Sequence, residues 1–318
     1  MNSRTAACLH VTNGDAVIHG FKKAGILGTH LAWRDVLHEG PVPGTVPLEE
    51  CSRVRGAYLA SRGFGRPIRI MQDLANRDAL IRRASEFEEV VLWFEHDLYD
   101  QLQILQILAF LRALEPAPVM VSLVQSDHYL GALSGDELLA LYPKRRTVTR
   151  AMFDRAQALW ADFTSPEPLA LGEQTKNEHP GFAHMRAALE RLCEEFPAPG
   201  DGLSRSARQA LAAVAQGPAR KEELFARAQG REEAPFLGDA TFYAILSDLQ
   251  RSPAPLVEGT EALLQPTALG RRVLGGDADW LEHAPADRWI GGIHLHGAHP
   301  PRWDTSRRAF ITAEEAVD

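Results

Sequence analysis

Residues 90–102, VVLWFEHDLYDQL, decide the fold class. The first five residues are a continuous apolar run, the pattern of a strand that is buried on both faces of a parallel sheet. Three polar residues follow, and residues 98–114 then carry a leucine every three or four positions, which predicts a helix with one apolar stripe. A buried strand that leads directly into such a helix is the basic unit of an α/β domain.

The residues on either side repeat this alternation. Apolar runs predict further strands at residues 7–11, within residues 26–36, and at residues 119–124. Helical spacing is present at residues 16–24, 49–62 and 73–86. We therefore expect an α/β domain with a Rossmann-like, mainly parallel sheet and right-handed crossovers.

The second half of the chain has a different order of elements. Three helices are predicted at residues 204–215, 219–229 and 239–251, followed by a β-hairpin and a short helix. This succession resembles a winged-helix domain, a smaller α+β unit. The expected division is an α/β domain at 1–140, a helical connecting segment at 141–200, the winged-helix-like domain at 201–275, and a C-terminal docking tail at 276–318.

Composition places the chain among folded proteins. It has 318 residues, of which 45% are hydrophobic and 24% are charged, and its formal net charge is -8. This composition excludes general disorder, and the acidic balance provides no overall basic field for nucleic acid or an anionic membrane. Residues 201–275 contain 9 basic and 9 acidic residues. The predicted third helix, residues 239–251, has two acids and one arginine, so DNA binding is the weaker prediction for this domain and packing or protein contact the stronger one.

Cysteine usage and hydropathy indicate a cytoplasmic protein. The three cysteines are far apart in sequence and form no C-x-x-C pair, so neither a disulfide framework nor a zinc knuckle is expected. The N-terminus lacks the apolar core of a signal peptide, and no 18-residue apolar stretch occurs. Secretion and membrane association are therefore not expected, and the oligomeric state is not predicted.

Polar residues gather where the predicted strands end. In an open parallel sheet, ligands bind outside the carboxyl ends of the strands. The residues there are Asn13, Gly14 and Asp15 at the first strand, Arg34, Asp35, His38 and Glu39 around the second, Glu95, His96 and Asp97 at the third, and Ser126, Asp127 and His128 at the fourth. The sequence thus predicts a crevice lined by acids and histidines.

Two uses of this crevice stay open at the level of sequence. Carboxylates and imidazoles could share a divalent metal that activates water, or they could act without metal as general acid and base. The expected catalytic residues are His38, Glu39, Glu95, His96 and Asp97. The expected cofactor- or ligand-binding residues are Asn13, Gly14, Asp15, Arg34, Asp35 and Asp127.

Each piece of this crevice also has a structural interpretation. Asp15 could cap the first helix, and Asp97 with Asp100 resembles a capping box. Gly14 could serve a tight turn, and Arg34 could pair with Asp35. In these alternatives the same residues stabilise the fold and take no part in binding or catalysis.

The C-terminal tail contains an unusual histidine pattern. Ile293 and Leu295 alternate with His294 and His296, which predicts a strand with both histidines on one face. Such a pair could bind a metal. The competing interpretation is a segment that docks on a core through two tryptophans, Trp289 and Trp303.

Three motifs occur in order along the first domain: HVTNGD at residues 10–15, WRDVLHEGP at residues 33–41, and WFEHDLYDQL at residues 93–102. Together they resemble the N-terminal domain of a bacterial family that is defined only as a domain of unknown function. Members are similar in having a C-terminal region like residues 287–297 and 302–304. The resemblance brings no established activity, cofactor or catalytic residue.

The function predicted from the residues is that of a hydrolase or transferase acting on a nucleotide or a related phosphorylated or ribosyl compound. In this hypothesis Asp15, Glu95 and Asp97 bind a metal or ribose hydroxyls, Arg34 holds an anionic group, and His38 or His96 transfers the proton. The alternative is a non-enzymatic regulator or adaptor. Its first domain would sense a ligand, and its winged helix would contact DNA or protein.

Overall fold

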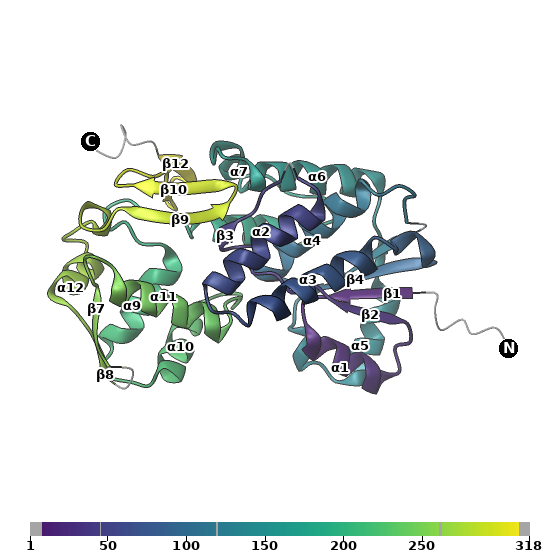
Figure 1. Cartoon of the computed structure of the whole chain (residues 1–318), viewed down its shortest axis with the longest axis horizontal. Helices are drawn as coiled ribbons and strands as arrows, with labels where there is room; N and C mark the ends of the chain where they lie inside the picture. The colour runs from purple at the N-terminus through teal and green to yellow at the C-terminus, as the bar shows by residue number, and fades with distance from the viewer. Residues whose placement is uncertain (1–7, 45, 119, 261–262, 312–318) are drawn as a thin grey trace. The chain divides into compact units, whose positions relative to one another are not determined.

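The computed structural model describes residues 8–44, 46–118, 120–260 and 263–311 (Figure 1). The chain divides into two compact units. Unit 1 comprises Met1–Ser165 and Asn177–Ala188, and unit 2 comprises Pro166–Lys176 and Leu189–Asp318. No helix in the described part of the chain is long and apolar enough to cross a membrane.

Unit 1 is built on a five-stranded sheet with the order β2-β1-β4-β5-β6. Its strands are β1 (Cys8–Thr12), β2 (Thr29–Ala32), β4 (Glu89–Glu95), β5 (Val121–Ser126) and β6 (Arg146–Thr147). The first four pair in parallel, and β6 is antiparallel to β5. The predicted α/β class with a mainly parallel sheet is therefore confirmed.

Helices lie between these strands and after the last of them. They are α1 (Asp15–Ala24), α2 (Leu48–Ser61), α3 (Pro67–Ile81), α4 (Leu98–Arg112), α5 (Gly135–Leu141) and α6 (Arg150–Thr164), and a two-residue strand β3 (Gly40–Pro41) precedes α2. The chain passes from β1 to β2 on one side and returns through α2 and α3 to β4 on the other side of β1. The direction of winding thus reverses between β1 and β4. This is the point at which open α/β sheets bind ligands.

The β4 strand is buried along its whole length because the sheet is covered on both faces. Val91 and Trp93 pack on one face with Val17 and Phe21 of α1. On α4, the expected single apolar stripe is an incomplete description, because its glutamines are buried as well as its leucines. One of these, Gln106, accepts a hydrogen bond from the Trp33 indole at 2.8 Å. Periodicity alone could not predict this burial, since Gln103 and Gln106 form hydrogen bonds with residues distant in sequence, Asp35 and Trp33.

Unit 2 begins with α7 (Leu169–Gln174), and the boundary between the units falls within α8 (Met185–Cys193). A single core then unites α9 (Arg205–Ala215), α10 (Lys221–Gln229), α11 (Asp239–Arg251), β7 (Val257–Thr260), β8 (Leu263–Pro266) and α12 (Ala268–Gly275). The strands β7 and β8 form an antiparallel hairpin. The order of three helices and a hairpin is the expected one, and the assignment to the winged-helix class stays a prediction.

The tail forms two antiparallel pairs, β9 (Ala286–Gly291) with β10 (Ile293–Gly297) and β11 (Arg302–Asp304) with β12 (Ala309–Ile311). Trp303 is buried, and its backbone N–H donates to Pro197 at 3.0 Å. Arg302 donates to the Ala198 carbonyl at 3.1 Å. Trp303 is thus an anchor of the kind predicted, and the tail packs as part of unit 2. The predicted connecting segment, residues 141–200, is divided between the two units.

Candidate functional site

Three carboxylates converge where the winding of the sheet reverses. Glu95 is the last residue of β4, Asp97 is the N-cap of α4, and Asp100 lies in the first turn of that helix. One oxygen of each lies within 4.8 Å of the others, and all three side chains are buried. We call Glu95, Asp97 and Asp100 the carboxylate cluster.

Hydrogen bonds fix the carboxylate cluster in position. Asn13, from the loop after β1, donates to Asp100 Oδ1 at 2.8 Å, and the Glu95 backbone N–H donates to Asp100 Oδ2 at 2.5 Å. The Leu130 N–H donates to Glu95 Oε1 at 2.7 Å, and Asp97 Oδ1 accepts from the Asp100 N–H at 3.1 Å. The predicted Asp97 cap is therefore present. The Asp100 side chain does not complete a capping box, because it turns back to β4.

Burial controls the protonation of the carboxylate cluster. It raises the pKa of Asp97 to about 7, and the nearby charge of Glu95 adds to the effect. Burial also raises the pKa of Glu95 and that of Asp100, the latter with further contributions from Asp97 and Glu95. Three close carboxylates in a low-dielectric environment do not all ionise unless a cation compensates them. The site can therefore hold protons at neutral pH or bind a cation.

Unit 1 has a cavity of about 210 Å³ that none of the three carboxylates lines. Its polar lining includes Arg34, Asp73 and Tyr99, and its apolar wall includes Leu59 and Phe64. Tyr99 lies on α4 between Asp97 and Asp100, so it belongs both to the cavity wall and to the helix turn that carries the carboxylates. The mixture of apolar wall and convergent polar groups is typical of small-molecule sites.

Arg34 is exposed and forms ion pairs within unit 1. Its Nε donates to Asp15 Oδ2 at 2.9 Å, and its guanidinium lies 4.0 Å from Asp73. The hydrogen bond to Asp15 raises the pKa of Arg34. The sequence hypothesis grouped Asp15 with Glu95 and Asp97. In the structure Asp15 contacts Arg34, and Asp100 is the third member of the carboxylate cluster. Asp15 also forms no side-chain cap on α1.

Asp35 forms a buried ion pair with Arg55. Arg55 of α2 donates to Asp35 Oδ1 at 2.9 Å, to the Val36 carbonyl at 2.7 Å and to the Glu39 carbonyl at 2.8 Å. Both charged side chains are fully buried. Through these hydrogen bonds Arg55 stabilises the conformation of the loop at residues 33–41. Asp35 therefore pairs with Arg55 rather than with Arg34, and sequence reasoning did not single out Arg55.

His38 and Glu39 lie on the same loop and are not members of the carboxylate cluster. His38 is buried, with its ring 6.2 Å from that of Tyr99, and Glu39 pairs with Arg62 at 3.0 Å. The structure does not bring either residue into the group formed by the three carboxylates.

His96 faces a second group of polar residues. Its ring centroid is 5.1 Å from Tyr129 and 6.0 Å from His184. His184 Nε2 lies 3.3 Å from Asp127, and burial lowers the pKa of His184. Sequence reasoning missed His184 because this residue lies in the segment 177–188, far from any predicted strand end.

Gly14 lies directly before α1 in an extended conformation, with φ of -173°, so no left-handed conformation requires a glycine there. A Cβ atom at this position would meet nothing within 4 Å. The backbone conformation at this position therefore does not require glycine, and the tight-turn interpretation of Gly14 stays a prediction. This open space lies at the N-cap position of α1.

Comparisons with known proteins do not identify the chain. No protein-family model matches it, and no curated protein matches it. The resemblance carried by the three motifs therefore stays a prediction, and the function is inferred from the site.

Proposed function

We propose that unit 1 is the Rossmann-like catalytic domain of a hydrolase or transferase that acts on a nucleotide or a related phosphorylated or ribosyl compound. The observation that carries the proposal is the carboxylate cluster, which lies at the reversal point of the sheet. Stability alone does not favour three adjacent buried carboxylates, because each costs desolvation energy and repels the others. Groups with strongly perturbed pKa values in a crevice are typical of functional sites.

The surroundings support a ligand of this class. The cavity beside Tyr99 offers an apolar wall on which a base or sugar can pack. Arg34 provides a planar cation for a phosphate or carboxylate, and its pairing with Asp15 and Asp73 orients its guanidinium. The space beside Gly14 admits an anionic group to the N-terminus of α1.

Asp97 is the proposed proton carrier. A carboxyl group with a pKa of about 7 exists in both protonation states at neutral pH, as general acid–base catalysis requires. His96 is the weaker candidate for the proton carrier, because its ring neighbours are Tyr129 and His184 rather than the carboxylates. In the metal-dependent version of the proposal, the carboxylate oxygens bind a hard divalent cation, which lowers the pKa values of the cluster and releases its protons.

The test is isothermal titration calorimetry of the full chain with nucleoside mono-, di- and triphosphates and with ribose phosphates, with and without Mg²⁺ or Mn²⁺. The critical variant is Asp97→Asn, because asparagine caps a helix as well as aspartate does but cannot exchange a proton. Glu95→Gln is compared with Glu88→Gln, an exposed carboxylate just before the same strand.

We expect at least one compound in this panel to bind the wild type. Asp97→Asn and Glu95→Gln should weaken its binding or abolish its turnover, whereas Glu88→Gln should do neither. Equal binding and turnover by all four proteins would refute the proposal.

The second candidate function is that of a ligand-sensing regulator, and the order of three helices and a hairpin in unit 2 favours it. The helix that would enter a DNA groove, α11, carries Asp239 and Asp248 against one arginine, Arg251, so protein is the better partner. A steep salt dependence of binding to mixed duplex DNA would support the DNA-binding form of this candidate.

A further inference from the structure

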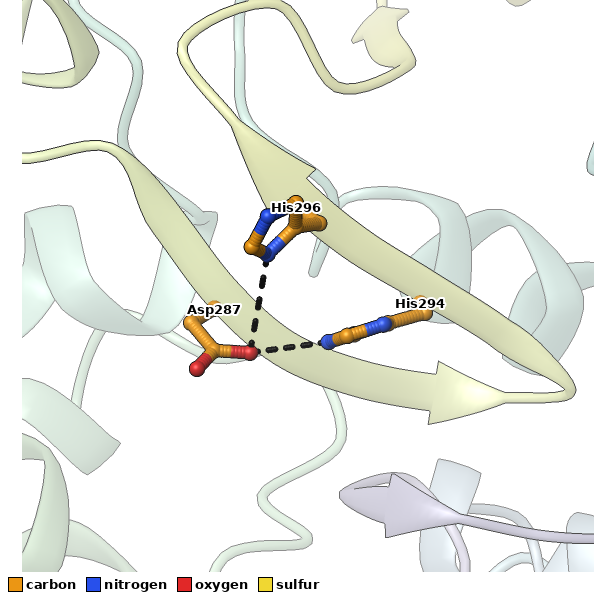
Figure 2. A group of neighbouring side chains, drawn as sticks. All are labelled: Asp287, His294 and His296. Atoms are coloured by element: carbon orange, nitrogen blue, oxygen red, sulfur yellow. Dashed lines mark hydrogen bonds and ion pairs between the residues drawn. The ribbon is translucent and has the colours of Figure 1, made fainter.

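The β9–β10 hairpin of unit 2 carries Asp287, His294 and His296 on one face (Figure 2). The register pairs His296 with Asp287 and His294 with Trp289, directly across the two strands. Ile293 and Leu295 alternate with the histidines and are buried, so both imidazoles are exposed. The hairpin therefore presents two imidazoles and one carboxylate to the same side.

The donor atoms of these three side chains converge. Asp287 Oδ1 lies 2.8 Å from His294 Nε2 and 4.0 Å from His296 Nδ1. One donor atom of each residue lies within 4.8 Å of the other two. Around a tetrahedral zinc ion the ligand atoms are about 3.3 Å apart, as Zn–N and Zn–O distances near 2.0–2.1 Å require. The two Asp287 distances fall on either side of this value, so small side-chain rotations would give a metal geometry.

Two further features hold the donors in place. The Trp289 indole stacks on the His294 ring, with centroids 4.4 Å apart and an interplanar angle of 2°. The stack orients the imidazole so that Nε2 faces Asp287. The turn between the strands uses Gly291 with a positive φ of 59°, which fits a tight two-residue hairpin and fixes the register of the ligands.

From this juxtaposition we infer that unit 2 contains a binding site for a divalent first-row transition ion, with Zn²⁺ as its representative. Its ligands are Asp287 Oδ1, His294 Nε2 and His296 Nδ1. Two imidazoles with one carboxylate favour zinc and related ions over Mg²⁺ and Ca²⁺, which prefer oxygen ligands alone. Three protein ligands leave a coordination position open to water or to a donor group of a ligand.

The competing interpretation is that Asp287 and His294 form only a surface ion pair. Exposed pairs of this kind contribute little to stability and bind no metal. The two interpretations differ in whether His296 matters, because the ion pair does not need it and the metal site does.

The test is a Zn²⁺ titration of the full chain by calorimetry. It compares the wild type with the double variant His294→Gln, His296→Gln, the single variant His296→Gln, and the control His283→Gln, which changes an exposed histidine elsewhere in unit 2. Because the changed histidines are exposed, the three histidine variants should fold, and circular dichroism checks the folding of every variant. Glu95→Gln is included so that binding to unit 1 is recognised separately.

We expect one equivalent of Zn²⁺ to bind at the β9–β10 hairpin of the wild type, His283→Gln and Glu95→Gln alike. The affinity of the hairpin for Zn²⁺ should fall at least tenfold in His296→Gln. In the double variant this binding should be absent. ¹⁵N spectra should show coordination shifts at Nε2 of His294 and Nδ1 of His296. The proposal is overturned if the double variant binds Zn²⁺ as the wild type does, if His296→Gln has no effect, or if Mg²⁺ binds this site as tightly as Zn²⁺.

Discussion

The carboxylate cluster of unit 1 and the Asp287–His294–His296 group of unit 2 each bring three potential ligand atoms within 4.8 Å of one another. Their surroundings are opposite, since the first group is buried and the second is exposed. Burial forces the carboxylates to keep protons or to acquire a cation, whereas water solvates the charges of the exposed group. The same spacing of side chains therefore yields a proton-holding site in one unit and a solvent-accessible ligand set in the other.

The largest expected difference between the two groups is in stability. Asp100→Ala would leave the Asn13 side chain and the Glu95 N–H without their acceptor, at a cost of about 2–4 kcal/mol in unfolding free energy. Asp287→Ala removes an exposed carboxylate and should cost less than about 0.5 kcal/mol. Urea unfolding of both variants checks the prediction. Equal losses would show that burial does not distinguish the two groups.

The next effect is a pH dependence of stability that arises from Asp97. Its pKa is about 7 in the folded protein and lies near 4 in an unfolded chain. Between these values the folded state binds the additional proton, so stability rises as the pH is lowered from 7 toward 4. As the pH is lowered from 7 to 4, the unfolding free energy of the wild type should rise by on the order of 1–3 kcal/mol relative to that of Asp97→Asn. A constant difference between the two proteins at every pH would contradict the raised pKa.

A smaller stability effect combined with a large binding effect is expected at Gly14. Gly14→Ser places a side chain in open space and introduces a favourable N-cap residue, so unfolding free energy should change by less than about 1 kcal/mol. If a ligand approaches the N-terminus of α1, its affinity should fall at least about tenfold, or about 1.4 kcal/mol. Calorimetry with a compound that binds the wild type measures this, and unchanged affinity would place the ligand elsewhere.

The smallest expected effect is the loss of the exposed ion pair. His294→Ala should change unfolding free energy by less than about 0.5 kcal/mol in metal-free buffer. With Zn²⁺ present, the wild type should gain thermal stability and the variant should not, because a ligand that binds only the folded state stabilises it by mass action. A loss of more than about 1 kcal/mol in metal-free buffer would give the pair a structural role.

Local patterns predicted the elements that carry the site. The apolar run before Glu95 indicated a buried strand, and its polar successors indicated the carboxyl edge of the sheet, so Asn13, Glu95 and Asp97 were predicted together and lie together. The sequence indicates that Asp100 lies in the first turn of the helix but does not single it out as a site residue. Its role depends on the Asn13 side chain, 87 positions away, and on a turn back to β4.

Choices among distant partners could not be predicted. Asp35 has an arginine beside it in sequence and pairs instead with Arg55, because α2 packs that side chain into the loop. His184 lies 88 positions after His96, and Gln125 helps to hold the segment 177–188 near it by hydrogen bonds with Gly181 and Ala183. Periodicity reports which face of an element is buried, but not which partner covers it.

The most direct test of the central claim is a carbon-13 NMR titration of the side-chain carboxyl groups of the full chain. With Asp97→Asn for assignment, it should show Asp97 titrating near a pKa of about 7, with Glu95 and Asp100 also above their ordinary range. If all three carboxyl groups ionise below about pH 5, as solvated carboxylates do, the carboxylate cluster holds no proton at neutral pH, and the account of unit 1 as an acid–base site is contradicted.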